Sequence, residues 1–168
     1  MKPLKNISWY IAVLLVVLAI AVIPVTAAAF DDADALKGMT SGKAVFDVNF
    51  GDAGKLALYL SVIKETHEGL VKQGVKPDLI LAFRGPSVLL ISTNRDKVPA
   101  EQQAKYDEVA KLLKDLKGVG VKLEVCSIAT RLMKVDNATI YPEIKVISNS
   151  FISLMGYQGK GYAYIPVF

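Results

Sequence analysis

Cys126 is the residue of this chain best suited to chemistry, and it is the only cysteine among the 168 residues. Apolar side chains alternate with polar residues and glycine over residues 119–125, which is typical of a strand, and apolar residues then recur at helical spacing over residues 128–133. The pattern predicts that the thiol lies where a strand passes into a helix. Free N–H groups and the positive dipole end of a helix N-terminus favour an anion, so a thiol there can become a nucleophilic thiolate. The alternative is that Cys126 is a small buried hydrophobic residue that closes a βα unit.

Further candidate residues follow the predicted strands. Ligands of parallel α/β sheets bind at the carboxyl ends of the strands, so this rule places all the candidates at one edge of the sheet. A cation near the thiol would lower its pKa further, and Arg84 is suited to this role; the alternative is that Arg84 makes a surface ion pair. For Gly85 the alternative is ordinary turn chemistry. The candidates are Asn49 and Asp52 after the first strand, Arg84 and Gly85 after the second, and Ser127 and Arg131 after the third.

Other kinds of site are not expected. The single histidine, His67, lies on the apolar stripe near the far end of the first predicted helix, so a Cys–His dyad within one subunit is not predicted. One cysteine and one histidine at unrelated positions make no metal-ligand cluster. No glycine-rich loop follows the first strand, which excludes phosphate-loop and dinucleotide fingerprints. We therefore expect no metal and no cofactor.

The N-terminus predicts a secretory signal peptide over residues 1–29. Lys2 and Lys5 precede an apolar run over residues 11–23, and Ala27 and Ala29 offer the small residues that signal peptidase needs. An uncleaved anchor is the alternative, because residues 6–30 carry no charge and could span a bilayer. The positive region holds no twin arginine, and no cysteine stands at the cleavage site to carry a lipid. The expected product of cleavage is a periplasmic or extracellular protein that does not remain in the membrane.

Charge and cysteine content limit the partners. The chain holds 20 basic and 16 acidic residues, so loss of Lys2 and Lys5 with the leader leaves 18 basic residues and a net charge near +2. The basic residues are scattered, which argues against a nucleic-acid partner. In an oxidising compartment a single cysteine is buried, paired between chains or kept as a reactive thiol.

The remaining elements predict one domain over residues 43–168, after a polar and loosely ordered lead-in at residues 30–42. Strands alternating with helices are typical of an α/β domain with a mostly parallel sheet and helices on both faces. Periodicity does not decide whether residues 87–92 are helical or extended. The predicted strands are residues 43–49, 78–84, 119–125, 143–148 and 161–166, and the predicted helices are residues 53–73, 99–117, 127–134 and 150–157.

Four stretches of the chain, taken in order, resemble the DsrE/DsrF-like sulfur-relay family, in particular its exported single-domain branch. They are residues 43–52, 79–88, 121–127 and 156–166. The resemblance implies a three-layer α/β/α, flavodoxin-like domain with a five-stranded, mostly parallel sheet that assembles into oligomers, here a homo-oligomer. It also implies a cysteine after a central strand that accepts sulfane sulfur as a persulfide, and Cys126 matches that position. Arg84 stands where many relatives carry histidine before Gly-Pro.

Two functions follow as expectations. The first is an exported sulfur-handling protein in which Cys126 accepts sulfane sulfur from a donor protein and transfers it to an acceptor protein. The alternative is a non-catalytic periplasmic oligomer or small-ligand binding module in which Cys126 is structural. Solvent exposure of the sulfur discriminates between them, since an inaccessible thiol favours the binding module.

Overall fold

The computed structural model describes residues 30–168, and the predicted signal peptide at residues 1–29 lies outside the described residues. Within the described part, no helix combines the length and the apolar character that a membrane crossing requires. The strands are β1 (Ser41–Val48), β2 (Lys76–Phe83), β3 (Lys122–Cys126), β4 (Lys145–Ile147) and β5 (Ala163–Val167). The α-helices are α2 (Ala33–Leu36), α3 (Ala53–Lys72), α4 (Gln103–Gly118), α5 (Ser127–Leu132) and α6 (Ser150–Gly159), and the 3₁₀ helices are η1 (Gly85–Leu90), η2 (Ala100–Gln102) and η3 (Asn137–Thr139).

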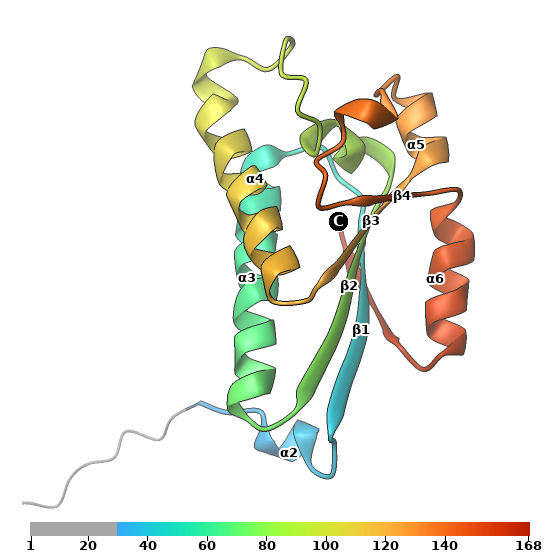
Figure 1. Ribbon diagram of the computed structural model, residues 1–168. Coiled ribbons are helices and arrows are strands. Elements are labelled where there is room, and N and C mark those ends of the chain that lie inside the picture. The colour runs from blue at the N-terminus through green and yellow to red at the C-terminus, as the bar shows by residue number, and fades with distance from the viewer. Residues whose placement is uncertain (1–29) are drawn as a thin grey trace, which may run out of the picture. The chain divides into compact units, whose positions relative to one another are not determined.

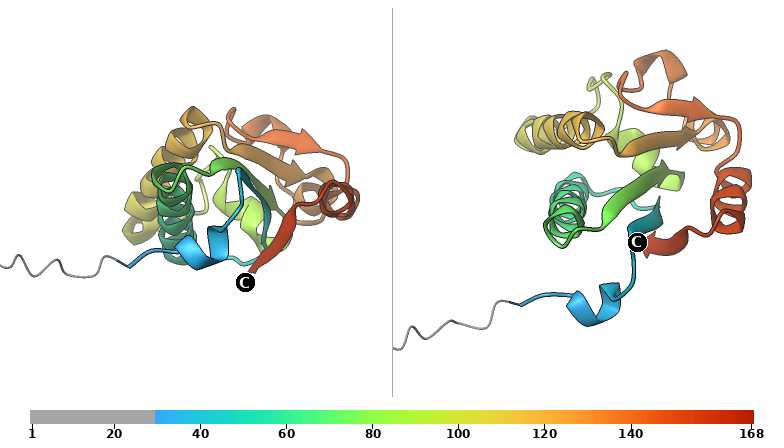
Figure 2. Two further views of the ribbon diagram at one scale, coloured as in Figure 1. Left: turned by 90° about the horizontal axis from the view of Figure 1, so that it is seen from below. Right: turned by 60° about the horizontal axis from the view of Figure 1, so that its bottom comes forward.

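The five strands form a single sheet in the order β4-β3-β2-β1-β5, and every pair of neighbouring strands is parallel. Helices α3 and α4 cover one face of the sheet and α6 crosses the other face (Figure 1). Two further views show the same three layers, with the sheet between the helices (Figure 2). The domain is therefore a three-layer α/β/α domain of the flavodoxin-like kind, as predicted.

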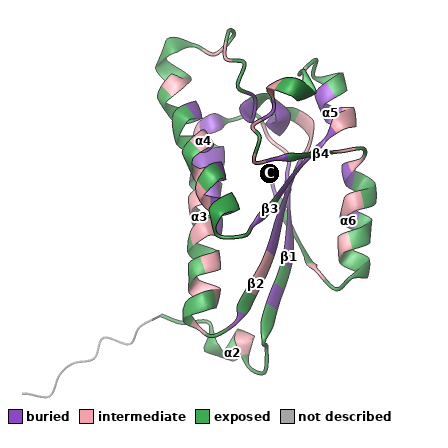
Figure 3. Ribbon diagram, viewed as in Figure 1, coloured by how far each residue is buried: buried purple, intermediate pink, exposed green. Residues whose placement is uncertain are grey.

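The two faces of the sheet differ in chemistry. The face toward α3 and α4 holds a large apolar core to which Phe46, Leu81 and Leu123 belong. The face toward α6 holds a small apolar cluster of Val45, Ile80, Ala82 and Leu154. The outer side of α6 is exposed along its length (Figure 3). Two buried carboxylates, those of Asp47 on β1 and Glu124 on β3, lie on this face of the sheet and accept hydrogen bonds there.

Several details differ from the sequence-based expectations. A short helix, α2, lies within the predicted lead-in, and β3 begins at Lys122 rather than at residue 119. Strand β1 begins at Ser41, inside the segment predicted as a lead-in. The second long helix begins at Gln103 rather than at Pro99, because a 3₁₀ turn (Ala100–Gln102) comes first. Glu124 is one of the polar residues in the alternating pattern of β3, and it is buried at 8% exposure because α6 covers it. The undecided stretch after β2 is the 3₁₀ helix η1.

Candidate functional site

Cys126 is the last residue of β3 and the residue that precedes the first turn of α5, as the sequence predicts. Its exposure is only 4%, so the thiol is buried at the carboxyl edge of the sheet. The amide of Ser150 donates a hydrogen bond to its Sγ over 3.4 Å. The sulfur therefore lies between the first turn of α5 and the first turn of α6.

Local contacts bring Ser150 to the sulfur. Strand β4 pairs with β3 so that Ile147 lies opposite Cys126, and α6 starts three residues later. The hydroxyl of Ser127 donates to the carbonyl of Ser148 over 3.0 Å and ties the two segments together. The side chain of Asn149 caps α6 by accepting from the amide of Phe151, so the Ser150 amide remains directed at the sulfur.

Burial and hydrogen bonding act on the thiol in opposite directions. Burial is the largest single influence and raises the pKa of Cys126. The amide of Ser150 donates to the sulfur, and this amide, the Ser150 hydroxyl and the backbone amides of Ala129 and Ile128 all favour the anionic form of the sulfur. Together these donors outweigh burial, and the pKa of Cys126 lies below its ordinary value. The sulfur thus lies among polar groups that favour its anionic form.

Arg84 lies directly after β2, and its guanidinium is engaged by a carboxylate. Nε donates to Oδ1 of Asp47 over 2.6 Å and Nη2 donates to Oδ2 over 2.7 Å, while the hydroxyl of Tyr164 also donates to Oδ2 over 2.6 Å. The guanidinium carbon lies 5.6 Å from the ring centroid of Phe151 on α6. Asp47 is fully buried, so this is an ion pair to an interior carboxylate rather than a surface pair. The donors that lower the thiol pKa are Ser150 and the backbone of α5.

The candidates after β1 and at the start of η1 have contacts that explain them structurally. Asp52 caps α3 by accepting from the amide of Lys55 over 2.6 Å. Gly85 has a left-handed φ of 54°, and a β-carbon there would overlap Oδ1 of Asn49. Asn49 and Gly85 are therefore in close contact, and only glycine fits this turn without strain.

Ser127 and Arg131 line an open cavity of about 480 Å³ beside α5, together with Thr130, Val135 and Asn137. Cys126 does not line this cavity, so the structure separates these two candidates from the thiol although they adjoin it in sequence. No group of three metal-ligating side chains occurs within residues 30–168.

Sequence reasoning missed Ser150 and Glu124. The Asn-Ser pair at residues 149–150 is a recognisable helix start, but its placement against Cys126 depends on the pairing of β3 with β4. The Cys126 side chain is only 4% exposed, and an inaccessible thiol favours the alternative in which the cysteine is structural.

Comparison with known proteins identifies relatives of the chain and proteins of similar fold. An uncharacterised protein of Aquifex aeolicus is 30% identical over 125 residues, which cover 74% of this chain and 55% of that protein, so the chain spans about half the length of this curated relative. The fold is similar to that of MTH1491, a protein of unknown function from Methanobacterium thermoautotrophicum, with a TM-score of 0.60, 19% identity and coverage of 76% of this chain and 100% of that chain.

The YchN protein of E. coli is also similar in fold, with a TM-score of 0.54, 15% identity and coverage of 75% of this chain and 99% of that chain. At such identities the likeness to solved structures shows the fold alone. The model of the DsrE/DsrF-like family matches residues 43–167. This range includes all the candidate residues and all five strands, apart from the first two residues of β1. The chain therefore belongs to the DsrE/DsrF-like family.

Proposed function

We propose that this protein handles sulfur and that Cys126 accepts sulfane sulfur as a persulfide and passes it to an acceptor. Membership of a family generally related to sulfur relay supports the first part. The observation that carries the second part is the hydrogen bond from the Ser150 amide to Sγ of Cys126. An amide donor at a sulfur stabilises negative charge on it, and the pKa of Cys126 is lowered accordingly.

The proposed transfer balances without an external oxidant. The thiolate of Cys126 attacks the outer sulfur of a donor persulfide or polysulfide, a new S–S bond forms, and the donor S–S bond breaks with the electron pair leaving on the donor thiolate. The sulfane sulfur keeps its oxidation state. Because the chain has no second cysteine, the bound sulfur must leave by attack of a thiolate from a partner protein or a small thiol.

The test is to incubate purified protein with polysulfide, remove the excess and weigh the intact chain beside a Cys126→Ser control. The native protein should gain the mass of one sulfur atom, and treatment with a small thiol should remove it. The control should gain none. A native protein that gains no sulfur and whose thiol resists alkylation in the folded state would contradict the proposal.

One observation favours the second candidate function. Cys126 is 4% exposed, and a thiol this buried fits a structural role in a non-catalytic periplasmic oligomer or small-ligand binding module. The two functions differ in one measurable property. Under the sulfur-handling proposal the folded protein reacts with an alkylating reagent faster than the unfolding rate, whereas a structural thiol reacts only when the chain unfolds.

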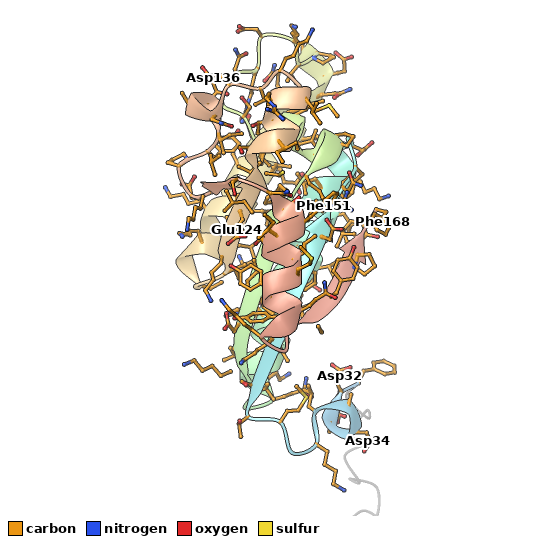
Figure 4. All side chains as sticks on the ribbon, turned by 90° about the vertical axis from the view of Figure 1, so that its right-hand side faces the viewer. Asp32, Asp34, Glu124, Asp136, Phe151 and Phe168 are labelled. Atoms are coloured by element: carbon orange, nitrogen blue, oxygen red, sulfur yellow. The ribbon has the colours of Figure 1, made fainter. Side chains whose placement is uncertain are left out.

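We also propose that the protein forms a homo-oligomer through α6 and β5. Helix α6 contains no charged residue and exposes large apolar side chains, and further apolar side chains are exposed on and after β5, the neighbouring strand at the edge of the sheet. Phe151 on α6 and Phe168 after β5 both lie on the side that faces the viewer in Figure 4. Exposed apolar side chains of this kind suit pairing with a copy of the same chain. The exposed residues are Phe151, Ile152, Met155, Tyr164 and Phe168.

Export to the periplasm through a cleaved signal peptide is part of the same proposal, and it rests on the composition of residues 1–29. A carrier in that compartment would meet its sulfur donor and acceptor outside the reducing cytoplasm. In that compartment the single cysteine of the chain cannot form an intrachain disulfide.

A further inference from the structure

Glu124 is a buried carboxylate that the proposed transfer does not use. It lies on β3 two residues before Cys126, so both side chains project from the same face of the sheet. Its exposure is 8%, and both carboxylate oxygens accept hydrogen bonds from α6. The hydroxyl of Ser153 donates to Oε2 over 2.6 Å and the hydroxyl of Tyr157 donates to Oε1 over 2.6 Å. Figure 4 shows Glu124 beside this helix.

The two donors share a helix face with Ser150. Residues 150, 153 and 157 are spaced three and four apart, so they project from one side of α6, and that side faces β3. Burial, followed by the hydrogen bond to Glu124, raises the pKa of Tyr157, so its phenol remains a donor through the physiological range. Glu124, Ser153 and Tyr157 form what we call the α6 clamp.

The distance from Glu124 to Cys126 along β3 is similar to the distance from the clamp residues to Ser150 along α6. Glu124 and Cys126 lie about 6.6 Å apart along a parallel strand. The point midway between Ser153 and Tyr157 lies about 7.5 Å along the helix from Ser150, and the helix runs opposite to the strand. Anchoring Glu124 to residues 153 and 157 therefore sets the Ser150 amide at the height of the Cys126 sulfur, where it donates over 3.4 Å.

We propose that Glu124 is a positioning residue, which holds α6 so that the Ser150 amide stays on the Cys126 sulfur. This inference rests on the proposed function, because the amide matters only if the sulfur carries charge. Glu124 does not touch the sulfur in the hydrogen bonds described, and it acts through the helix. Its oxygens need the hydroxyl donors, since a carboxylate with so little exposure would otherwise lose its hydration without replacement.

A direct charge effect would have the opposite sign. A carboxylate near a thiolate disfavours the thiolate, so removal of the Glu124 charge alone would lower the thiol pKa. Loss of positioning would raise it, because the Ser150 amide would move away. Other charged groups lie near this end of the sheet: Arg84, directly after β2, is paired with Asp47, and Lys145 on β4 lies opposite Glu124 in the sheet register. Substitutions of Ser153 and Tyr157 remove none of these charges.

The experiment measures the thiol pKa in variants that remove the clamp and leave every charge in place. Because Cys126 is the only cysteine, ¹³C labelling of cysteine Cβ gives one resonance, and its pH titration does not depend on solvent access. The test variants are Tyr157→Phe and the double variant Ser153→Ala/Tyr157→Phe. The matched control is Tyr164→Phe, which removes an equivalent 2.6 Å tyrosine-to-carboxylate bond, that to Asp47, from the other buried carboxylate.

We expect the titration midpoint to rise in Tyr157→Phe, to rise further in the double variant, and to stay at the native value in Tyr164→Phe. Glu124→Gln should also raise it. Unchanged midpoints in the clamp variants, or an equal rise in the Tyr164→Phe control, would overturn the positioning role and leave a contribution to stability only. A fall in Glu124→Gln together with unchanged midpoints in the clamp variants would show direct charge repulsion alone and would overturn the positioning role.

Sulfur loading measured on the same proteins separates this inference from the proposed function. If the native protein loads no sulfur but the clamp variants shift the midpoint, the proposed function fails and the positioning role stands. If the native protein loads sulfur and the midpoints do not move, the positioning role alone fails. Thermal unfolding of each variant shows that it is folded, and should Glu124→Gln not fold, the tyrosine variants decide.

Discussion

Arg84 and Asp47 are joined by two parallel hydrogen bonds, although they lie 37 residues apart, with Asp47 on β1 and Arg84 directly after the neighbouring strand β2. The carboxylate of Asp47 is buried, with 1% of its side chain exposed, whereas 21% of the Arg84 side chain is exposed. Removal of the arginine therefore leaves the more buried charge unpaired. Breaking a buried pair from one side is strongly destabilising, because the remaining charge has lost its hydration.

We predict that Arg84→Met lowers the free energy of unfolding by about 3 kcal/mol and leaves the pKa of Cys126 at its native value. The second part follows because the donors to the sulfur are Ser150 and the amides of α5. Urea unfolding and the cysteine titration check the two parts separately. A stable variant with a raised thiol pKa would show that Arg84 acts on the sulfur, which is the role that the sequence suggested for it.

Gly85 gives a prediction about the turn that follows β2. An alanine there would hold a left-handed φ at a cost of about 1–2 kcal/mol, and its β-carbon would also displace the side chain of Asn49. Gly85→Ala should therefore be destabilising, and introducing it together with Asn49→Ala should relieve the overlap but keep the backbone strain. The matched control is Gly156→Ala in α6, where the added carbon meets no neighbour and should stabilise by about 0.5–1 kcal/mol. Equal effects at both positions would contradict this account.

The central part of the fold was predictable from the chain because its signals are local. The alternation over β3 and the helical spacing after residue 127 place Cys126 at a strand-to-helix junction, and the structure has it there. The same alternation cannot show which polar residue of a strand lies under a helix. Glu124 is buried for that reason, while its neighbour Lys122 on the same face is exposed.

The donors around the sulfur were not predictable because they depend on a distant contact. Ser150 lies 24 residues after Cys126 and reaches it through a strand of three residues, β4, whose pairing no local pattern fixes. The pairing of Arg84 with Asp47 was also not predictable, because an aspartate within an apolar strand pattern does not indicate which cation lies next to it in the fold. Local periodicity thus identified the elements, and the tertiary contacts decided which side chains meet.

The homo-oligomer leads to a prediction about α6. Ile152 is 61% exposed, and its replacement by lysine would place a charge inside the proposed interface. Ile152→Lys should lower the mass measured by light scattering to that of the monomer. Leu58→Lys on α3 is the matched control, since Leu58 is 63% exposed and lies on the opposite face of the sheet. A native protein that is already monomeric at micromolar concentration would remove the proposal.

The leader is tested by the mass of the exported protein. Cleavage after Ala29 removes Lys2, Lys5 and the apolar run, so the mature chain should begin at Phe30 and appear in the periplasmic fraction. Replacing Ala27 and Ala29 by bulky residues should block cleavage and retain the protein in the membrane fraction. A native chain that keeps residues 1–25 in the membrane would support the uncleaved anchor.

The lowered pKa of Cys126 predicts how stability changes with pH. In the unfolded chain the thiol titrates near its ordinary value of about 8.5, and in the folded chain it titrates below that value. Between the two pKa values the unfolded state binds a proton that the folded state does not bind, so the free energy of unfolding rises with pH. The stabilisation is therefore fully present above the unfolded pKa and is lost as the pH falls through the folded pKa.

Cys126→Ser isolates this effect, because serine does not titrate in the range and its packing difference is the same at every pH. The free energy of unfolding of the native protein minus that of Cys126→Ser should rise with pH up to about 8.5 and be constant beyond it. Urea unfolding under reducing conditions at a series of pH values gives this difference directly. A difference that falls as the pH rises would mean that the folded thiol has a raised pKa. Burial would then outweigh the donors of Ser150, and Cys126 would be a structural residue.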